Sequence, residues 1–207
     1  MDDLIDHQQF RQKYDNDPNN LLNQKGAQGM IYEGKDLEDG TPVANKRALY
    51  KGEDYERYSI ISEWKRAKQF NHTSLLRYHI AERVRTDLGI YDFGVMELVE
   101  GGLNIREYFQ RNKPGNETIK EVFISVLEGL SYLHTKGIIH RDIKPSNILI
   151  KIDKDGQPVP KIIDFGISKE HNNYEASVSG TIGTYAYMAP EQINPKKGDK
   201  LRPNIDI

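Results

Sequence analysis

The sequence predicts an α+β fold of two lobes with a cleft between them, the first of antiparallel strands plus one helix and the second mainly helical. Short apolar stretches between residues 21 and 51 are separated by glycines and by the turn Asp39-Gly40, as in a meander of strands. A helical pattern follows at residues 53–70. The strongest apolar stripe lies later, at residues 118–136, and also has helical spacing.

The N-terminal half continues this alternation of elements. Residues 1–20 are polar, and we expect a short amphipathic helix followed by a turn at Asp-Asn-Asp-Pro-Asn-Asn, with no readable function. Two strand-like stretches at residues 76–81 and 90–98 follow the helix at 53–70. The pair Gly101-Gly102 then breaks the pattern, so the first lobe is expected to end near this point.

The second half begins with the helix at residues 118–136, for which Gly137 is the expected stop. Two short apolar stretches at residues 148–152 and 161–163 are joined by an Asp-Lys-Asp-Gly turn and predict a hairpin. The stripe of the helix has more apolar positions than one packing face needs: Val122, Phe123, Val126, Leu127, Leu130 and Leu133.

Composition narrows the class of protein. Twelve Tyr and six Phe in 207 residues argue against a wholly disordered chain. A net charge of −2 gives no electrostatic footprint for nucleic acid. The lack of cysteine excludes disulfides, thiolate zinc sites and cysteine nucleophiles. Without an apolar window of ~18 residues or a signal-peptide pattern at the start, the sequence predicts no membrane segment and a cytoplasmic location.

The side chains suited to catalysis or metal binding are concentrated in one loop. The run His140 to Asn147 places charged and polar side chains between two apolar stretches, and Asp164-Phe165-Gly166 follows the hairpin. Two carboxylates and a carboxamide beyond strand ends form a hard oxygen-ligand set that suits Mg²⁺. Lys144, beside the first carboxylate, would offset charge on a transferring phosphate. Each piece alone could be a solvated loop, but the run, Asp-Phe-Gly and a later Ala-Pro-Glu in this order indicate phosphoryl chemistry.

With these motifs the chain resembles the eukaryotic protein kinase family over residues 21–207. The resemblance implies that Asp142 is the catalytic base, that Lys144 stabilises the γ-phosphate, and that Asn147 and Asp164 hold Mg²⁺. It gives His140 a structural role. Lys144 and Thr184 match the serine/threonine branch, so the implied activity is transfer of the ATP γ-phosphate to Ser or Thr of protein substrates.

The resemblance also implies a nucleotide site in the first lobe. Lys46, in Val-Ala-Asn-Lys, would bind the α- and β-phosphates, and strand alternation puts Ala44 with Lys46 on one face and Asn45 on the other. Glu63 would be the ion-pair partner of Lys46, and Glu53 or Glu56 remains an alternative. The remaining ATP-binding candidates are Gly26 and Gly29 of the glycine loop, Ile31 and Leu149 around the adenine with Ala44, Met96 as gatekeeper, and the backbone of Glu97 and Val99.

The segment from Asp164 to Glu191 corresponds to the activation segment of the family. Its candidate phosphorylation sites are Ser177, Ser179 and Thr181, and Arg141 precedes the catalytic Asp as in kinases that this modification switches. An upstream kinase or self-phosphorylation could supply the phosphate. An unmodified loop is the alternative.

The domain organisation follows from the resemblance: an extension at residues 1–20, a small lobe at 21–98 and an incomplete, truncated large lobe at 99–207. Asp206 fits the Asp that begins a central buried helix in the family, so the helices that complete the large lobe are expected to be missing. A finer similarity, to the stress-sensing kinase–endoribonuclease of the endoplasmic reticulum, rests on Gly26 to Gly29, Lys46-Arg47 and the hairpin. A nucleotide-binding pseudokinase-like scaffold and an inactive truncated product remain alternatives.

Overall fold

The computed structural model describes residues 4–23, 29–53, 59–165, 185–193 and 202–206. The chain divides into two compact units. The first, called the sheet unit, comprises Met1–Asn71 and Leu76–Val99. The second, called the helical unit, comprises His72–Leu75 and Glu100–Ile207.

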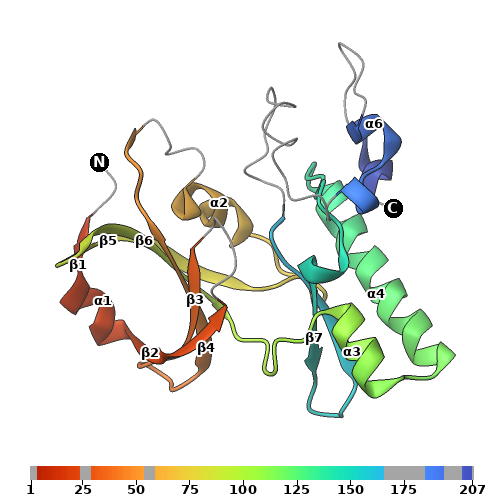
Figure 1. Ribbon diagram of the computed structural model, residues 1–207, viewed down its shortest axis with the longest axis horizontal. Coiled ribbons are helices and arrows are strands. Elements are labelled where there is room, and N and C mark those ends of the chain that lie inside the picture. Colours follow the sequence, from red (N-terminus) through yellow and green to blue (C-terminus); the bar gives the residue numbers. More distant parts are fainter. Residues whose placement is uncertain (1–3, 24–28, 54–58, 166–184, 194–201, 207) are drawn as a thin grey trace. The chain divides into compact units, whose positions relative to one another are not determined.

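The sheet unit is built on a six-stranded sheet in the order β1-β5-β6-β4-β3-β2 (Figure 1). All neighbouring strands are antiparallel except β1, which runs parallel to β5. The predicted meander is confirmed, because β2, β3 and β4 pair in sequence order. The strand bounds are Ile5–Asp6 (β1), Tyr14–Asn23 (β2), Met30–Asp36 (β3), Pro42–Leu49 (β4), Tyr78–Thr86 (β5) and Gly89–Glu97 (β6).

The N-terminal residues contain the predicted helix but not the predicted turn. Helix α1, His7–Lys13, begins at Asp6, whose side chain accepts a hydrogen bond from the Gln8 backbone in a capping box with Gln9. The turn expected at residues 15–20 is wrong, because β2 runs through this stretch. A register shift on β2 takes up the extra polar residues, and pairing with β3 resumes beyond it.

Helix α2, Ile60–Ala67, lies within the predicted helical range. Ser59 caps its start, since its hydroxyl accepts a hydrogen bond from the Ser62 backbone at 3.1 Å. The Trp64 ring lies against Gly94 of β6, where an added Cβ would be 2.2 Å from the ring. The same ring meets Tyr78 edge-on at 4.7 Å. Helix α2 therefore packs on the face of the sheet to which Gly94 is open.

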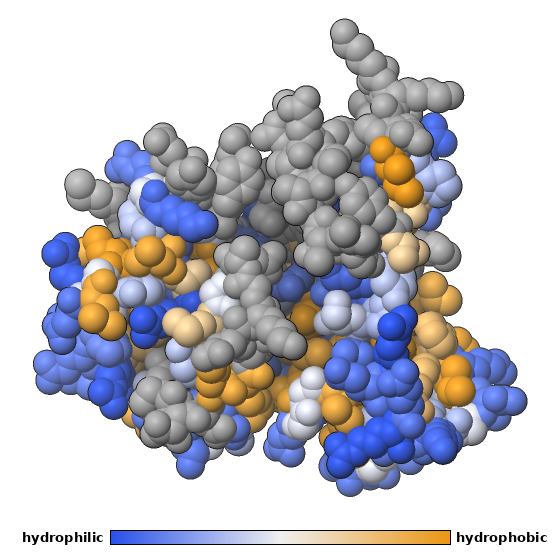
Figure 2. Space-filling model, in the orientation of Figure 1, coloured by the Kyte–Doolittle hydropathy of each residue, from blue (hydrophilic) through white to orange (hydrophobic). Residues whose placement is uncertain are grey.

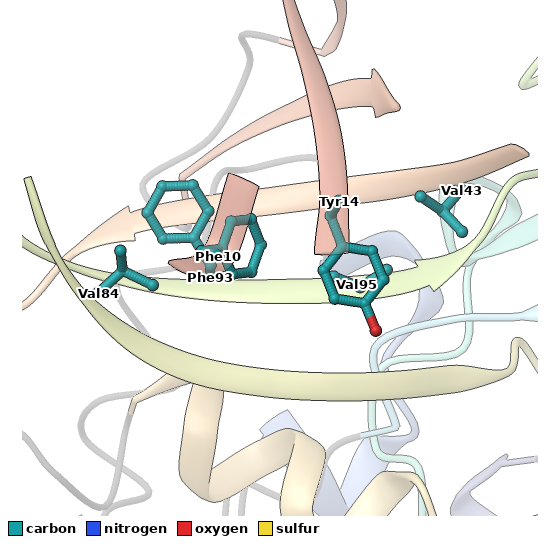
Figure 3. Packing of buried hydrophobic residues seen from close by; sticks show 6 residues of the cluster. All are labelled: Phe10, Tyr14, Val43, Val84, Phe93 and Val95. Atoms are coloured by element: carbon teal, nitrogen blue, oxygen red, sulfur yellow. The ribbon is translucent and has the colours of Figure 1, made fainter. Parts of the chain in front are cut away.

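The opposite face of the same sheet has its own apolar core. Because side chains alternate along a strand, Phe93 and Val95 point away from the face of Gly94. They pack with α1 and the beginning of β2, so helices cover both faces of the sheet. Figure 3 shows the six buried members of this cluster: Phe10, Tyr14, Val43, Val84, Phe93 and Val95.

The helical unit contains helices that the sequence pattern did not predict. Helix α3, Ile105–Asn112, begins at Asn104, which forms a capping box with Glu107. The predicted hairpin is confirmed as β7, Ile148–Ile152, paired antiparallel with β8, Pro158–Ile162. The unit also has a short helix α6, Pro190–Ile193, and single turns at Pro145–Asn147, Tyr185–Tyr187 and Pro203–Asp206.

The predicted long helix is confirmed as α4, Asn116–Thr135, followed by Gly137 at φ 74°. Val122, Val126, Leu130 and Leu133 of the predicted stripe are buried. Phe123 and Leu127 remain 50% and 47% exposed. Figure 2 shows apolar surface at the right, where α4 lies in Figure 1. No helix in the described ranges has the length and apolar character needed to cross a membrane.

Candidate active site

The loop between α4 and β7 holds the Asp142 carboxylate with two donors. Lys144 Nζ donates to Asp142 Oδ2 at 2.9 Å. Asn147 Nδ2 donates to the same oxygen at 3.1 Å and to the Asp142 backbone carbonyl at 2.8 Å. The three side chains predicted to act together thus meet at one carboxylate, and their bonds fix its orientation.

A second carboxylate, Asp206, supports the backbone of this loop. Its fully buried side chain accepts hydrogen bonds from the His140 N–H at 2.8 Å and the Arg141 N–H at 2.7 Å. His134 Nε2 lies 2.9 Å from Asp206 Oδ2. The resemblance placed Asp206 in the family pattern, but no local signal pointed to His134 as its partner. Asp206 therefore holds the two residues that lead directly into Asp142.

His140 is buried with both ring nitrogens engaged. Nε2 lies 2.9 Å from the Ile163 carbonyl, which can only accept, and the Asp142 N–H donates to Nδ1 at 3.3 Å. These partners require a neutral ring with its proton on Nε2. Burial lowers the pKa of His140, which agrees with a neutral ring. The histidine thus positions the loop, as the sequence analysis expected.

The β7–β8 hairpin brings the two candidate metal ligands to one end. Asn147 precedes β7 and Asp164 follows β8, and the Ile163 N–H donates to the Asn147 carbonyl at 3.0 Å. Because Asn147 donates its amide N–H groups to Asp142, its Oδ1 oxygen remains as an acceptor. A carboxamide and a carboxylate oxygen at one place suit Mg²⁺.

This ligand set is small, since the described residues include no group of three or more His, Cys, Asp and Glu able to hold a metal ion. Mg²⁺ is commonly bound through one or two protein ligands together with phosphates and water. Asn147 and Asp164 therefore fit a magnesium ion carried with a nucleotide better than a metal held by protein alone.

In the sheet unit, the strand register arranges the phosphate-binding candidates. Lys46 pairs with Ile31 on one side and Gly94 on the other, so its side chain shares the face of Gly94. Ala44 and Lys46 are both buried there. Asn45 points to the opposite face and donates to the Asp15 carbonyl at 3.4 Å. The predicted alternation is confirmed.

The predicted ion pair of Lys46 is not formed. Among the described residues, no carboxylate lies within 4.0 Å of Lys46 Nζ, whether from Glu63 or from Glu53. Glu63, on the first turn of α2, makes an interaction elsewhere. The third alternative, Glu56, lies outside the described residues.

Two backbone positions near the end of β6 differ in their bonding. The Glu97 N–H donates to the Arg77 carbonyl at 2.9 Å, so it is occupied. Val99 is buried, yet its backbone makes no hydrogen bond to any of the described residues. Met96, on β6 opposite Ala44 of β4, is also buried. Within the described part of the chain the Val99 N–H and C=O thus have no partner, which fits a flat heterocycle with a matching donor and acceptor.

Of the remaining site candidates, Gly29 and Leu149 are described by the structure and the others are not. Gly29 has φ 109°, and a Cβ there would lie 2.3 Å from the Arg47 carbonyl, so the close approach requires glycine. Leu149 is half-buried on β7 and forms a bridge with Asn104. Several predicted residues lie outside the described ranges: Gly26, Ser177, Ser179, Thr181 and Thr184.

One side chain near the site was missed from the sequence. Gln192 Nε2 donates to the Arg141 carbonyl at 3.0 Å, and its Oε1 accepts from the Ala189 N–H at 3.0 Å. Gln192 thereby ties the Ala-Pro-Glu stretch to the residue before Asp142. Gln192 directly follows the Ala-Pro-Glu motif, but Arg141, to which it donates, lies 51 positions earlier in the sequence.

Comparison with known proteins identifies the class. The protein kinase domain model matches residues 24–207, and the chain belongs to this family. It is 38% identical over 173 residues to MAP3K epsilon protein kinase 1 of Arabidopsis thaliana, covering 82% of this chain and 12% of that protein. Identity is 30% over 196 residues to the serine/threonine-protein kinase STE20 of Debaryomyces hansenii, covering 92% and 17%.

A bacterial relative shows similar identity over a larger share of its own length. The serine/threonine-protein kinase PknL of Mycobacterium bovis is 32% identical over 185 residues, which cover 88% of this chain and 44% of that protein. The chain thus spans less than half the length of each of these relatives.

Proposed function

We propose that this chain carries the catalytic residues of a protein serine/threonine kinase, which transfers the γ-phosphate of ATP to Ser or Thr hydroxyls of protein substrates. The observation that carries the proposal is the Asp142 carboxylate bound by Lys144 and Asn147, beside the hairpin end that holds Asp164. Relatives named as serine/threonine kinases support the choice of acceptor.

Each polar residue of the loop has a chemical task in this proposal. Asp142 accepts a hydrogen bond from the acceptor hydroxyl and takes its proton as the oxygen attacks phosphorus. Lys144 offsets the negative charge on the phosphate in transfer. Asn147 and Asp164 would hold Mg²⁺, which neutralises the phosphate oxygens when it is bound. Asp206 and His140 keep the loop backbone in place.

The sheet unit would contribute nucleotide-binding residues. Lys46 binds phosphate oxygens, supported by its buried position with no carboxylate of the described residues close by. Ile31 and Ala44 contact the adenine. Leu149, in the helical unit, is a further candidate from the family resemblance. The Val99 backbone and the Glu97 carbonyl pair with the adenine. Gly26 and Gly29 allow the chain to approach phosphate, and Glu63 is the candidate partner of Lys46 once nucleotide is bound.

Regulation and location remain predictions. Phosphorylation of Ser177, Ser179 or Thr181, by an upstream kinase or by the protein itself, would pair with Arg141. The similarity to the kinase–endoribonuclease of the endoplasmic reticulum receives no support from the relatives found, so the proposal extends to no nuclease or stress-sensing role. A cytoplasmic location likewise remains a prediction.

The test is transfer of labelled γ-phosphate from Mg²⁺–ATP to peptides that differ only in carrying Ser, Thr or Tyr. We expect the wild-type chain to label Ser or Thr. Asp142→Asn should reduce the rate by about 10²–10⁴-fold, because a general base is lost. Asp155→Asn, the same change in the exposed hairpin turn, is the matched control and should retain full rate.

Three outcomes would contradict the proposal. Predominant labelling of Tyr would refute the acceptor class. An Asp142→Asn variant as fast as wild type would remove the assigned base. ATP binding by a folded wild-type chain without any transfer would favour the nucleotide-binding scaffold instead.

A further inference from the structure

We propose that residues 5–14, which precede the family match and are called the N-terminal clasp below, position the strands that carry Ala44, Lys46 and Met96. The inference rests on the proposed function, in which these strands bind ATP. It assigns a role to a segment that lies before residue 24, where the protein kinase domain match begins.

The clasp reaches both edges of the six-stranded sheet. At one edge β1 pairs in parallel with β5, with Ile5 opposite Val84. At the other edge β2 begins beside the end of β3, with Tyr14 opposite Asp36. Helix α1 crosses the face between them (Figure 1), and its Lys13 carbonyl accepts a hydrogen bond from the Leu37 N–H at 2.8 Å. Ten residues thus join the two edges of the sheet.

One buried side chain fastens the clasp to the middle strands. Phe10 is the only buried residue of α1 and is fully shielded from solvent. Its ring lies 4.8 Å from Phe93 and 5.5 Å from Tyr14 (Figure 3). The same cluster includes Val43 of β4, Val84 of β5 and Val95 of β6, so the clasp shares one apolar core with residues of three strands.

These back-face residues alternate with the proposed ATP-binding residues on the same strands. Val43 precedes Ala44, and Val95 precedes Met96, while Ala44 and Met96 face each other in the register of β4 and β6. A close-packed interior transmits a change of volume to the strands around it. A cavity in the cluster that includes Val43 and Val95 should therefore displace the residues on the other face of the same strands.

A polar contact adds a second connection. Asn45, next to Lys46, donates its amide to the Asp15 carbonyl at the beginning of β2. Gly34 of β3 leaves room for this contact, since a Cβ there would lie 2.2 Å from both the Asn45 amide and the Asp15 carbonyl. The strand that bears Lys46 is thus linked to the chain immediately after the clasp.

The test is steady-state kinetics of the full chain at varied ATP concentration, with urea unfolding measured in parallel. We expect Phe10→Ala to raise KM for ATP by roughly five- to tenfold, while kcat at saturating ATP stays within about twofold. Phe10→Leu, which refills most of the space, should restore KM. Gln12→Ala on the exposed side of α1 is the control and should match wild type.

The same variants can overturn the inference. A Phe10→Ala chain that is less stable in urea but keeps the wild-type KM for ATP would show that the clasp only stabilises the fold. If Phe10→Ala does not fold, Asn45→Ala replaces it, with an expected rise in KM of about two- to threefold, and an unchanged KM would contradict the inference. Should wild type transfer no phosphate, the proposed function fails, whereas the dissociation constant of a fluorescent ATP analogue still tests the clasp.

Discussion

Different kinds of interaction stabilise the interior of each of the two units. The sheet unit has apolar contacts on both faces, with Phe10 and Phe93 on one and Trp64 against Gly94 on the other. The region of the helical unit around the candidate site depends on directed hydrogen bonds to Asp142 and Asp206. The same unit also buries apolar side chains of α4, among them Val126 and Leu130.

The difference predicts how each unit responds to change. An apolar core depends on volume, so conservative substitutions weaken it by degrees. A buried hydrogen-bond network depends on each partner, because one lost acceptor leaves its donors unsatisfied. We therefore expect substitutions in the sheet unit to change stability and nucleotide affinity, and substitutions in the polar network to change catalysis or folding abruptly.

The largest expected loss of stability comes from Asp206→Ala. The change leaves the backbone N–H groups of His140 and Arg141 without their acceptor in a buried place. We expect the free energy of unfolding to fall by about 3–5 kcal/mol. Asn204→Ala, on an exposed residue of the same short turn, should change it by less than about 0.5 kcal/mol. Equal urea midpoints for the two variants would contradict the role given to Asp206.

A pair of leucines on α4 tests the apolar part of the helical unit. Leu130 is buried and Leu127 is exposed on the same helix. Leu130→Ala should lower the free energy of unfolding by about 2–5 kcal/mol, since a cavity forms. Leu127→Ala should cost less than about 0.5 kcal/mol. A similar loss for both would mean that the exposed face of α4 is covered in solution.

Gly94→Ala tests the close contact on the α2 face of the sheet. The new Cβ would lie 2.2 Å from the Trp64 ring, so the helix has to shift. We expect a loss of about 1–3 kcal/mol by thermal or urea unfolding. Gly115→Ala, where a Cβ meets open space, is the control. An unchanged stability of Gly94→Ala would contradict the observed packing of Trp64.

The smallest expected effect is that of mild acid. Burial lowers the pKa of His140, and partial desolvation together with the positive charge of Arg77 lowers the pKa of His79, which is exposed at the surface. Above an ordinary histidine pKa of about 6.5 both rings are neutral folded or unfolded, so their contribution is complete. As the pH falls below this value the unfolded chain takes up protons first, and stability decreases. Urea midpoints measured from about pH 7.5 to about pH 5.5 should fall, and His79→Gln should lessen the fall. A constant or rising midpoint would contradict these pKa directions.

The sequence predicted elements with a strong local signal. The meander, the β7–β8 hairpin and α4 follow from turn residues and apolar spacing. Helix α3 was missed because it has eight residues and one buried side chain, although Asn104 and Glu107 carry a capping-box signal. The helix of the N-terminal clasp was predicted, but its strand pairing with β5 and β3 was not, since the segment is polar and Phe10 is the one buried residue of α1.

The contacts of the candidate site likewise divide into those that a local motif predicted and those that it did not. The cluster of Asp142, Lys144 and Asn147 lies within six consecutive residues, so the motif predicted their proximity. The contact of His134 with Asp206 joins positions 72 apart, which no local pattern specifies. The pair of Lys46 and Glu63 was predicted from the resemblance and is not among the ion pairs of the described residues. Side-chain pairing depends on how α2 packs, which lies beyond the information in a motif.

The measurement that tests the account most directly compares Asp142→Asn with Phe10→Ala in one set of kinetics at varied ATP. The two substitutions should change different kinetic parameters. Asp142→Asn lowers kcat by about 10²–10⁴-fold and leaves KM for ATP within about twofold, because the base acts on the acceptor hydroxyl. Phe10→Ala raises KM for ATP and leaves kcat nearly unchanged. If both variants change the same parameter, or if Asp142→Asn keeps the wild-type kcat, the assignment of chemistry to the helical unit and nucleotide positioning to the sheet unit is contradicted.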